Sequence, residues 1–422
     1  VWTRLNDPVL NALVAKAEAA NPEIASAASR VREARARQRA DLAALGGQVG
    51  LSCSVAAQRQ TETGTFPVDR IPGFDTEYVL YDVHFDAAWE LDLFGRKQAR
   101  RDIAAARLAS EQERFDDVRT SLLADLARAY VEYRGTQTEM ALLETIIERQ
   151  QSLFDAQTFR REQGEASDLQ VERARAQLIE YQTRRPALVA SHRAALYRLA
   201  RLSSMEVAQV ETLLTAPQGL PDMDMAVMVD LPSNVLRQRP DIRMAERNYV
   251  VAARRSDLAR LDLYPNVTLF ASAGPSTIEL GDLIDPASLA LSLGAMVDWT
   301  VLDGGRKAAL ADASDEQRIQ AEQAYRSTVL DALTEIETRY AQYRETQHEL
   351  TLRARSAKTR STLADMAHAR FEGGTGTQVD ILETERDAAD AKLAVTRLQT
   401  NAFVQLIALE KALGLTMTEP AG

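Results

Sequence analysis

The sequence has few of the residues from which metal sites and disulfides are built. It contains one cysteine, Cys53, and four histidines, at positions 84, 192, 348 and 368. One cysteine excludes an intramolecular disulfide and a thiolate cluster, and four scattered histidines argue against a histidine-rich metal centre. The sequence also lacks a nucleophile elbow, a phosphate-binding loop and a metal-binding spacing. We therefore predict a protein that is not an enzyme and uses no cofactor or metal.

Long hydrophobic runs and an excess of basic charge are also absent. The longest stretch without a charged residue, 42–58, includes three glycines and is shorter than the roughly 20 apolar residues of a membrane-spanning helix. Transmembrane strands of about 9–11 alternating residues would leave no such run. The net charge of −11 argues against nucleic acid as a partner. Because the chain begins at Val1 without a leader, we expect a processed or truncated chain.

The chain repeats itself at a nearly constant spacing. Trp89 and the segment Gly95-Arg96-Lys97 return 210 residues later as Trp299 and Gly305-Arg306-Lys307, and Tyr130-x-x-Tyr133-Arg134 returns as Tyr340-x-x-Tyr343-Arg344. Ordered matches of this kind predict an internal two-fold repeat. We predict repeats at 1–215 and 225–417, with a linker or equatorial region at 204–232.

Each repeat predicts the same four elements: a helix, a β-hairpin, a very long helix and a return helix. The ranges are 8–45, 48–92, 96–163 and 167–203 in the first repeat, and 231–263, 266–302, 306–372 and 377–413 in the second. Long helices joined antiparallel through glycine-containing turns are typical of coiled-coil hairpins whose core neighbours complete. Pro186 predicts a kink or break in the first return helix.

The strand segments alternate in polarity with a period of two. Between 79 and 92, apolar side chains such as Val83 and Phe85 alternate with charged ones such as Asp86, and the apolar series reaches Trp89; the segment 288–301 alternates likewise and reaches Trp299. Alternation alone also fits a soluble sheet that lies on a helix. The strand length, the charged opposite face and the two tryptophans, as membrane-interface anchors, favour transmembrane strands.

Four such strands cannot close a barrel, and an open sheet edge cannot lie in lipid. A membrane-spanning sheet therefore requires oligomerisation, with eight strands from two copies or twelve from three. We predict strands at about 48–58, 78–92, 266–274 and 288–302.

Three motifs make the chain similar to the TolC-like outer-membrane efflux proteins, also called outer-membrane factors. They are Trp89-Glu90-Leu91-Asp92-Leu93-Phe94-Gly95-Arg96, Arg239-Pro240-Asp241-Ile242-Arg243-Met244-Ala245-Glu246 and Val379-Asp380-Ile381-Leu382-Glu383-Thr384-Glu385-Arg386. The chain most resembles the branch that serves resistance-nodulation-division multidrug pumps. The resemblance implies a mixed, mainly α fold. In it, three chains form a coiled-coil α-barrel across the periplasm and a shared 12-stranded transmembrane β-barrel in the outer membrane.

The resemblance also implies function and partners. It implies the exit duct of a tripartite efflux system, which passively conducts drugs or other small toxic compounds from an inner-membrane pump and a periplasmic adaptor to the exterior. The partners are then two further copies of the chain, the adaptor, the pump and outer-membrane lipid, but not nucleic acid. Many members of this branch carry a lipidated N-terminal cysteine, so the resemblance allows a lipoprotein. Two alternatives stay open: the exit duct of a type I protein secretion system, and a soluble periplasmic coiled-coil scaffold or adaptor.

Four carboxylates of the second return helix, Asp380, Glu383, Asp387 and Asp390, have the spacing i, i+3, i+7 and i+10. This spacing places them on one helical stripe, and a solvated helix face would show the same pattern. The resemblance implies that Asp380 and Glu383, extended by Asp387, form acidic rings at a periplasmic gate.

Other predicted site residues lie at the hairpin tips. The resemblance implies a contact between hairpins at the positions of Phe371 and Gln170, although Phe371 lacks the hydroxyl that many relatives have there. It also implies that the tip turns meet the adaptor. These turns contain Gly164, Glu165, Gly373, Gly374 and Thr375. Glycine is ordinary at any helix end, so the turns alone would not predict docking.

Overall fold

The computed structural model describes residues 7–61, 75–215, 219–220 and 236–414. The chain forms two compact units. Unit 1 comprises residues 1–30, 112–244 and 326–422, and unit 2 comprises residues 31–111 and 245–325. Each unit contains segments from both predicted repeats, whose boundaries stay a prediction.

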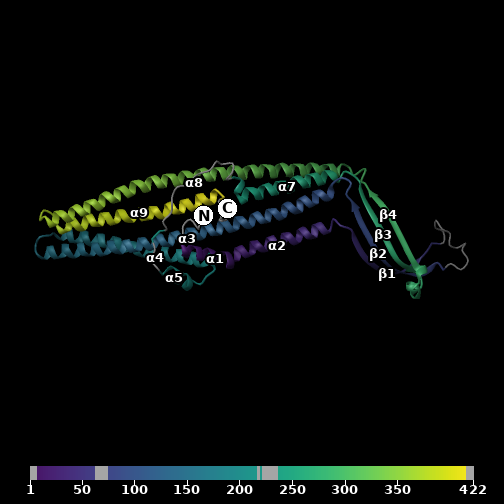
Figure 1. The fold of residues 1–422 in the computed structure, drawn as a ribbon, viewed down its shortest axis with the longest axis horizontal. Helices are drawn as coiled ribbons and strands as arrows, with labels where there is room; N and C mark the ends of the chain where they lie inside the picture. The colour runs from purple at the N-terminus through teal and green to yellow at the C-terminus, as the bar shows by residue number, and fades with distance from the viewer. Residues whose placement is uncertain (1–6, 62–74, 216–218, 221–235, 415–422) are drawn as a thin grey trace. The chain divides into compact units, whose positions relative to one another are not determined.

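Helices make up unit 1, and several of them continue into unit 2 (Figure 1). The helices are α1 (Pro8–Ala20), α2 (Pro22–Ala43), α3 (Arg96–Glu162), α4 (Asp168–Ser203), α5 (Val207–Leu214), α7 (Pro240–Leu261), α8 (Arg306–Glu372) and α9 (Gln378–Ala412). Both α3 and α8 have 67 residues, and from their tip turns α4 and α9 run back beside them. None of the helices in the described ranges combines the length and the hydropathy of a membrane span.

The helix expected at 8–45 is two helices, because Asn21 separates α1 from α2. The Asn21 side-chain oxygen Oδ1 accepts from the Glu23 backbone amide (2.8 Å), and the side-chain nitrogen Nδ2 donates to the Leu202 carbonyl (2.8 Å). Of the kink or break expected at Pro186, the break is wrong, since α4 continues through this residue, and the kink stays a prediction. Tyr181 and Leu188, on either side of it, are buried in one apolar cluster, which keeps the helix packed despite the lost hydrogen bond.

The predicted linker 204–232 contains α5. Its residues 216–218 and 221–232 lie outside the described residues, as do residues 231–235 of the helix predicted at 231–263. Arg239, directly before α7, joins the start of that helix to the end of α9 and to α8. The Arg239 guanidinium donates to the Ala412 carbonyl (2.6 Å) and to the Glu335 carboxylate (2.9 Å).

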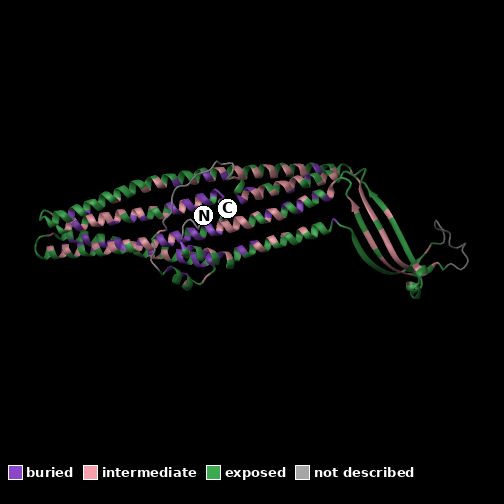
Figure 2. Cartoon of the chain, viewed as in Figure 1, coloured by how far each residue is buried: buried purple, intermediate pink, exposed green. Residues whose placement is uncertain are grey.

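The main core of unit 1 gathers around α1, α5 and the middle of α3, where Figure 2 shows many buried residues. Leu10, Leu123 and Leu199 are fully buried there, and burial of each such side chain is worth roughly 1.5–3 kcal/mol. A series of hydrogen bonds between polar side chains crosses this core. Arg134, itself fully buried, donates to the Tyr130 hydroxyl (3.1 Å), and that hydroxyl donates to Asp7.

Asp7 also caps α1 by accepting from the Val9 amide (2.9 Å). Burial, together with the hydrogen bond to Asp7, raises the pKa of the Tyr130 hydroxyl, which therefore stays a proton donor at physiological pH. The chain from Arg134 to Asp7 thus fixes the first helix to the middle of α3.

Unit 2 contains a four-stranded antiparallel sheet with the order β1-β2-β3-β4. The strands are β1 (Gln48–Arg59), β2 (Glu77–Leu91), β3 (Asn266–Thr277) and β4 (Leu289–Asp298). Both predicted hairpins are present, and pairing of β2 with β3 joins them. Among the described residues, β1 and β4 each keep one edge without a strand partner.

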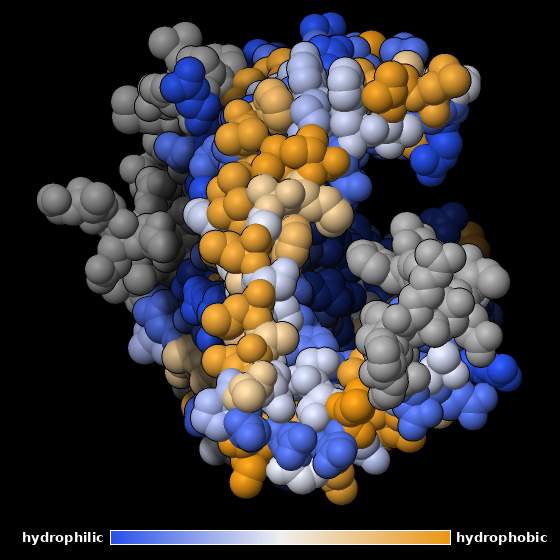
Figure 3. Space-filling model, turned by 90° about the vertical axis from the view of Figure 1, so that its right-hand side faces the viewer, coloured by the Kyte–Doolittle hydropathy of each residue, from blue (hydrophilic) through white to orange (hydrophobic). Residues whose placement is uncertain are grey.

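The sheet has one apolar and one polar face, because alternate side chains of a strand point in opposite directions. On the apolar face, Val49 is 72%, Leu291 is 74% and Leu293 is 85% exposed. Figure 3 shows a band of hydrophobic residues on the face in view. A sheet lying on a helix would bury these residues, so the structure of the chain gives no support to the soluble-sheet alternative.

Candidate functional site

The two hairpin tips have the same backbone geometry. Gly164 (φ +79°) and Gly374 (φ +72°) both adopt the left-handed conformation, which favours glycine. In each turn an amide reaches back to close the preceding helix: Glu165 to the Arg160 carbonyl (2.8 Å) and Thr375 to the Arg370 carbonyl (2.9 Å). A Cβ at either glycine would meet nothing within 4 Å. Backbone conformation, and not crowding, therefore requires glycine at these tips.

The remaining tip residues support the turns. The Glu165 carboxylate lies 3.8 Å from Arg160, the Thr375 hydroxyl donates to the Arg370 carbonyl (3.2 Å), and Gly373 donates its amide to the Ala369 carbonyl (3.0 Å).

Gln170 and Asp380 occupy the same place in the two hairpins. Each is the third residue of a helix, and its side chain accepts from the backbone amide of the capping residue: Ser167 for Gln170 (2.8 Å) and Thr377 for Asp380 (2.9 Å). This is the capping-box arrangement. The Thr377 amide lowers the pKa of the Asp380 carboxyl, so the carboxylate is charged at neutral pH.

The four carboxylates of the predicted stripe have different environments. Asp387 lies 2.6 Å from Arg386 and 3.8 Å from Arg360. Asp390 accepts from the Tyr181 hydroxyl and lies 3.9 Å from Arg184. Glu383 is exposed, and no hydrogen bond or ion pair joins its carboxylate to another described residue. Glu383 is thus the exposed stripe residue without a hydrogen bond, and Arg386 interacts with its charge through space, whereas Asp380 also has a local capping role.

The structure does not link Phe371 to Gln170 within the described residues of one chain. Phe371 is 46% exposed at the end of α8, and Gln170 is engaged in its own cap. The predicted contact between these positions stays a prediction.

Other residues link the two hairpins of one chain, and sequence reasoning missed them. Arg386 of α9 donates to Gln177 of α4 (3.0 Å), and Tyr181 of α4 donates to Asp390 of α9. Burial and this hydrogen bond raise the pKa of the Tyr181 hydroxyl. Both pairs are separated by 209 residues, almost the spacing of the repeat. Since α4 and α9 are equivalent helices that lie side by side, the repeat spacing itself could have indicated these pairs.

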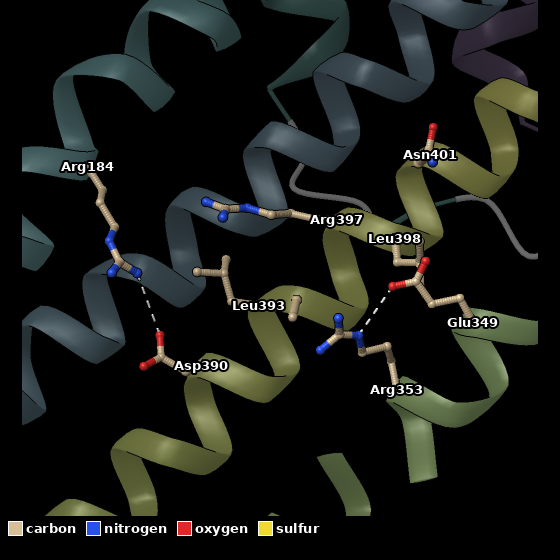
Figure 4. A pocket seen from close by; sticks show the side chains of 9 residues that line it. Arg184, Glu349, Arg353, Asp390, Leu393, Arg397, Leu398 and Asn401 are labelled. Carbon is tan, nitrogen blue, oxygen red and sulfur yellow. Dashed lines mark hydrogen bonds and ion pairs between the residues drawn. The ribbon is translucent and has the colours of Figure 1, made fainter. Parts of the chain in front are cut away.

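A polar cavity of about 490 Å³ lies next to these links. In Figure 4, Arg184 points toward Asp390, and Arg353 of α8 points toward Glu349. A third arginine of the lining, Arg397, pairs with Glu139 (2.7 Å). Because each arginine faces a carboxylate, the cavity has no strong preference for one sign of charge. Within the described ranges, no group of three or more histidine, cysteine or acidic side chains is placed to hold a metal ion.

The two predicted membrane-interface anchors, Trp89 and Trp299, belong to unit 2, one within the sheet and one directly after it. Trp89 is 49% exposed in β2, and the Lys97 ammonium lies 5.4 Å from the centre of its ring. Trp299 follows β4, is 58% exposed, and donates its ring N–H to the Leu263 carbonyl (3.1 Å). Both side chains present an apolar body with a polar partner nearby, as interfacial aromatic residues do, but their contact with lipid stays a prediction.

Comparison with known proteins agrees with this architecture. The family model described as "Outer membrane efflux protein" matches residues 13–205 and 231–415. Outer membrane protein OprJ of Pseudomonas aeruginosa is 26% identical over 370 residues, which cover 86% of this chain and 76% of OprJ. Nodulation protein T of Rhizobium leguminosarum bv. viciae is 25% identical over 394 residues, which cover 93% of this chain and 79% of the relative.

Among solved structures, the outer-membrane channel OprN has a TM-score of 0.87 at 27% identity, with 98% of this chain and 91% of OprN covered. The outer membrane protein VceC of Vibrio cholerae has a TM-score of 0.84 at 21% identity, with 98% of each chain covered, and supports the fold alone.

The fold and these matches define the class: a TolC-like channel protein, mainly α, with α-barrel and β-barrel parts. The chain belongs to the outer membrane efflux protein family. It is an outer-membrane efflux channel and not an enzyme, so the predicted family, fold class and location are confirmed.

Proposed function

We propose that this chain forms a homotrimeric exit duct of a tripartite efflux system. Small toxic compounds enter from an inner-membrane pump through a periplasmic adaptor and pass outward without covalent chemistry. The glycine tips contact the adaptor, and Asp380 and Glu383 line the periplasmic gate. The energy for transport comes from the pump.

The observation that carries this proposal is the exposed apolar face of an open sheet. Residues such as Leu291 and Leu293 are exposed on one face, and the outer strands β1 and β4 each have an unpaired edge among the described residues. Unpaired backbone groups are costly in lipid, so a membrane-embedded sheet must be closed by further copies. Three copies of four strands provide the twelve strands of the predicted barrel, with the polar face around the lumen.

The names of the relatives favour efflux over the secretion of proteins. One relative is the toluene efflux pump outer membrane protein TtgF of Pseudomonas putida, 25% identical over 418 residues that cover 97% of this chain and 83% of TtgF. This relative's name refers to a small compound, which supports an efflux duct over the exit duct of a type I protein secretion system.

Arginine substitutions on the two faces of β4 test the proposal. Leu291 lies on the apolar face, and its neighbour Ser292 lies opposite Ser272 on the polar face. Arginine near the bilayer midplane costs about 2–4 kcal/mol on the lipid face, and each trimer would carry three copies. We expect L291R to reduce outer-membrane assembly strongly, and S292R to assemble and conduct.

The measurements are the amount of trimer in outer-membrane fractions, by native mass spectrometry, and channel activity in planar bilayers. Equal assembly of L291R and S292R would contradict the assignment of the faces. A wild-type protein that stays monomeric in detergent and forms no channels would contradict the duct itself.

A further inference from the structure

One aromatic residue breaks the alternation of the sheet. The apolar face of β3 carries Leu269 and Ala271, whereas Thr268 and Ser272 belong to the polar face. Phe270 lies between them, on the polar face, with Ala88 of β2 and Gly294 of β4 as its register partners.

The Phe270 ring lies over one of these small neighbours. A Cβ built on Gly294 would be only 2.5 Å from Phe270 Cζ, so the ring covers the space that a side chain would fill. The ring is nevertheless 39% exposed, and Met296 on the same face, opposite Thr268, is 51% exposed. Phe270 and Met296, here called the Phe270 patch, are therefore exposed apolar side chains on the face that also carries Asp86, Glu90 and Ser272.

Carboxylates lie around this patch. Asp86 and Glu90 are the next residues of the polar face on either side of Ala88, the partner of Phe270. On β4, Asp298 follows Met296 on the same face. Asp86 accepts from the Ser52 hydroxyl (2.7 Å) and lies 3.4 Å from the His84 ring. Glu90 lies 3.5 Å from Arg100, which partly balances its charge, so Asp86 and Asp298 contribute most of the negative charge beside the patch.

An aromatic ring beside carboxylates has a definite chemical preference. The ring face attracts cations through its quadrupole, and it also gains from contact with apolar groups. The carboxylates attract positive charge and disfavour anions. A solute that satisfies both features is an organic cation with an apolar body.

We propose that the Phe270 patch is a contact site for lipophilic organic cations on their way through the channel. This inference rests on the proposed function, because the polar face becomes a lumen wall only when several copies close the sheet. In that arrangement each copy contributes one patch at the same depth. The bland alternative is that the ring only covers Gly294, as aromatic side chains do beside glycine in many sheets.

The probe is tetraphenylphosphonium, added to single wild-type channels in planar bilayers. We expect it to interrupt the current for measurable times, and we expect F270S to shorten these times by a factor of about 3 to 10. F270Y should retain them, since it keeps the ring. Tetramethylammonium, which lacks an apolar body of this size, should respond little to the substitution.

Phe85 supplies a matched control. It lies on the apolar face of β2, opposite Ala273, and F85S removes the same ring there. Channels of F85S that insert should show wild-type interruption times. If F85S shortened them as much as F270S, the effect would not belong to the polar face and the proposal would fail.

Equal interruption times in F270S and wild-type channels would show that the ring only covers Gly294. If F270S does not assemble, M296Q replaces it, because Met296 pairs with Thr268 and not with Phe270 or Gly294. M296Q should shorten the interruptions by a smaller factor, and unchanged times would overturn the proposal. Absence of any conductance in the wild type would instead contradict the duct function, so the two failures are distinguishable.

Discussion

The same short motif occurs in both halves of the chain, and its middle tyrosine is buried in both, as Tyr133 and Tyr343, but the surroundings of its first and last residues differ. In the first half, Tyr130 and Arg134 are fully buried and continue the hydrogen-bonded chain to Asp7. In the second half, Tyr340 is 37% exposed, and the Arg344 side chain is 68% exposed and pairs with its neighbour Glu345 (3.1 Å). The difference arises because α1 and α5 pack against α3. The repeated sequence thus keeps the helix and one buried tyrosine in both halves, whereas the environment of the other two residues depends on what packs against each helix.

The largest expected effect separates these two arginines. R134A should destabilise the protein by about 3 kcal/mol, because it removes a fully buried group and leaves its partners unsatisfied. R344A should change stability by less than about 0.5 kcal/mol, as exposed substitutions usually do. Thermal unfolding in detergent, followed by circular dichroism, measures both. Similar shifts in Tm for the two variants would show that the burial difference has no energetic weight.

Substitutions of the two tip glycines test whether the two hairpins contribute equally to docking. G164V and G374V force a β-branched residue into the left-handed region, which costs roughly 1–3 kcal/mol, and add bulk to the proposed docking surface. We expect each to abolish export in a strain that depends on this protein, while trimers still form. G164N and G374N are the controls, since asparagine tolerates this conformation better.

Unchanged export in both valine variants would remove the tips from the docking surface. Loss of export in only one of them would mean that the two hairpins dock unequally.

The smallest expected effect concerns the charge that distinguishes Asp380 from Gln170. D380N makes the second cap neutral like the first, and E383Q removes the exposed charge without touching the cap. We expect both to weaken block by divalent cations from the periplasmic side, E383Q more than D380N. Replacing both residues by alanine should also raise single-channel conductance, as measured in planar bilayers. Wild-type conductance and block in the double alanine variant would make the stripe an ordinary solvated face.

The pH dependence of the Asp380 cap follows from the direction of its pKa shift. The Thr377 amide lowers the pKa of this carboxyl, so the charged cap stabilises the start of α9 at pH values above the unfolded pKa of about 3.9. This stabilisation is lost as the pH falls through the lower, folded pKa. Acidification from pH 7 to 5 should therefore leave the Asp380 cap intact. The difference in stability between the wild type and D380N, whose cap is neutral, should be the same at both pH values.

The sequence was most informative where a single periodicity controls the structure. Strict alternation located four strands and their two faces, since one face is apolar along each strand. The same alternation places Phe270 on the polar face, but it does not show that the ring lies over Gly294, because this contact depends on the register between β3 and β4. The break at Asn21 was also missed, although Asn21 followed by Pro22 is a local signal for the start of a helix; only the hydrogen bond to Leu202, 181 residues away, could not be read from the local sequence.

The sequence predicted which residue types form the candidate site, but not which of them contact one another. The glycine turns and the carboxylate stripe were recognised from local spacing. The capping role of Asp380 follows from the Thr377-x-x-Asp380 pattern and could have been predicted. The link between Tyr181 and Asp390 could not be predicted from local patterns, and only the repeat spacing, which makes α4 and α9 equivalent helices, could have indicated it.

Because α3 and α8 have equal lengths, the two hairpin tips lie at the same number of residues from the repeated motif. Arg134 precedes Gly164 by as many residues as Arg344 precedes Gly374. One residue inserted between Arg134 and Gly164 would advance that tip by about 1.5 Å and turn it by about 100°. The first tip would then no longer match its counterpart. We therefore expect a change in the length of one hairpin to be tolerated only when the other hairpin changes equally.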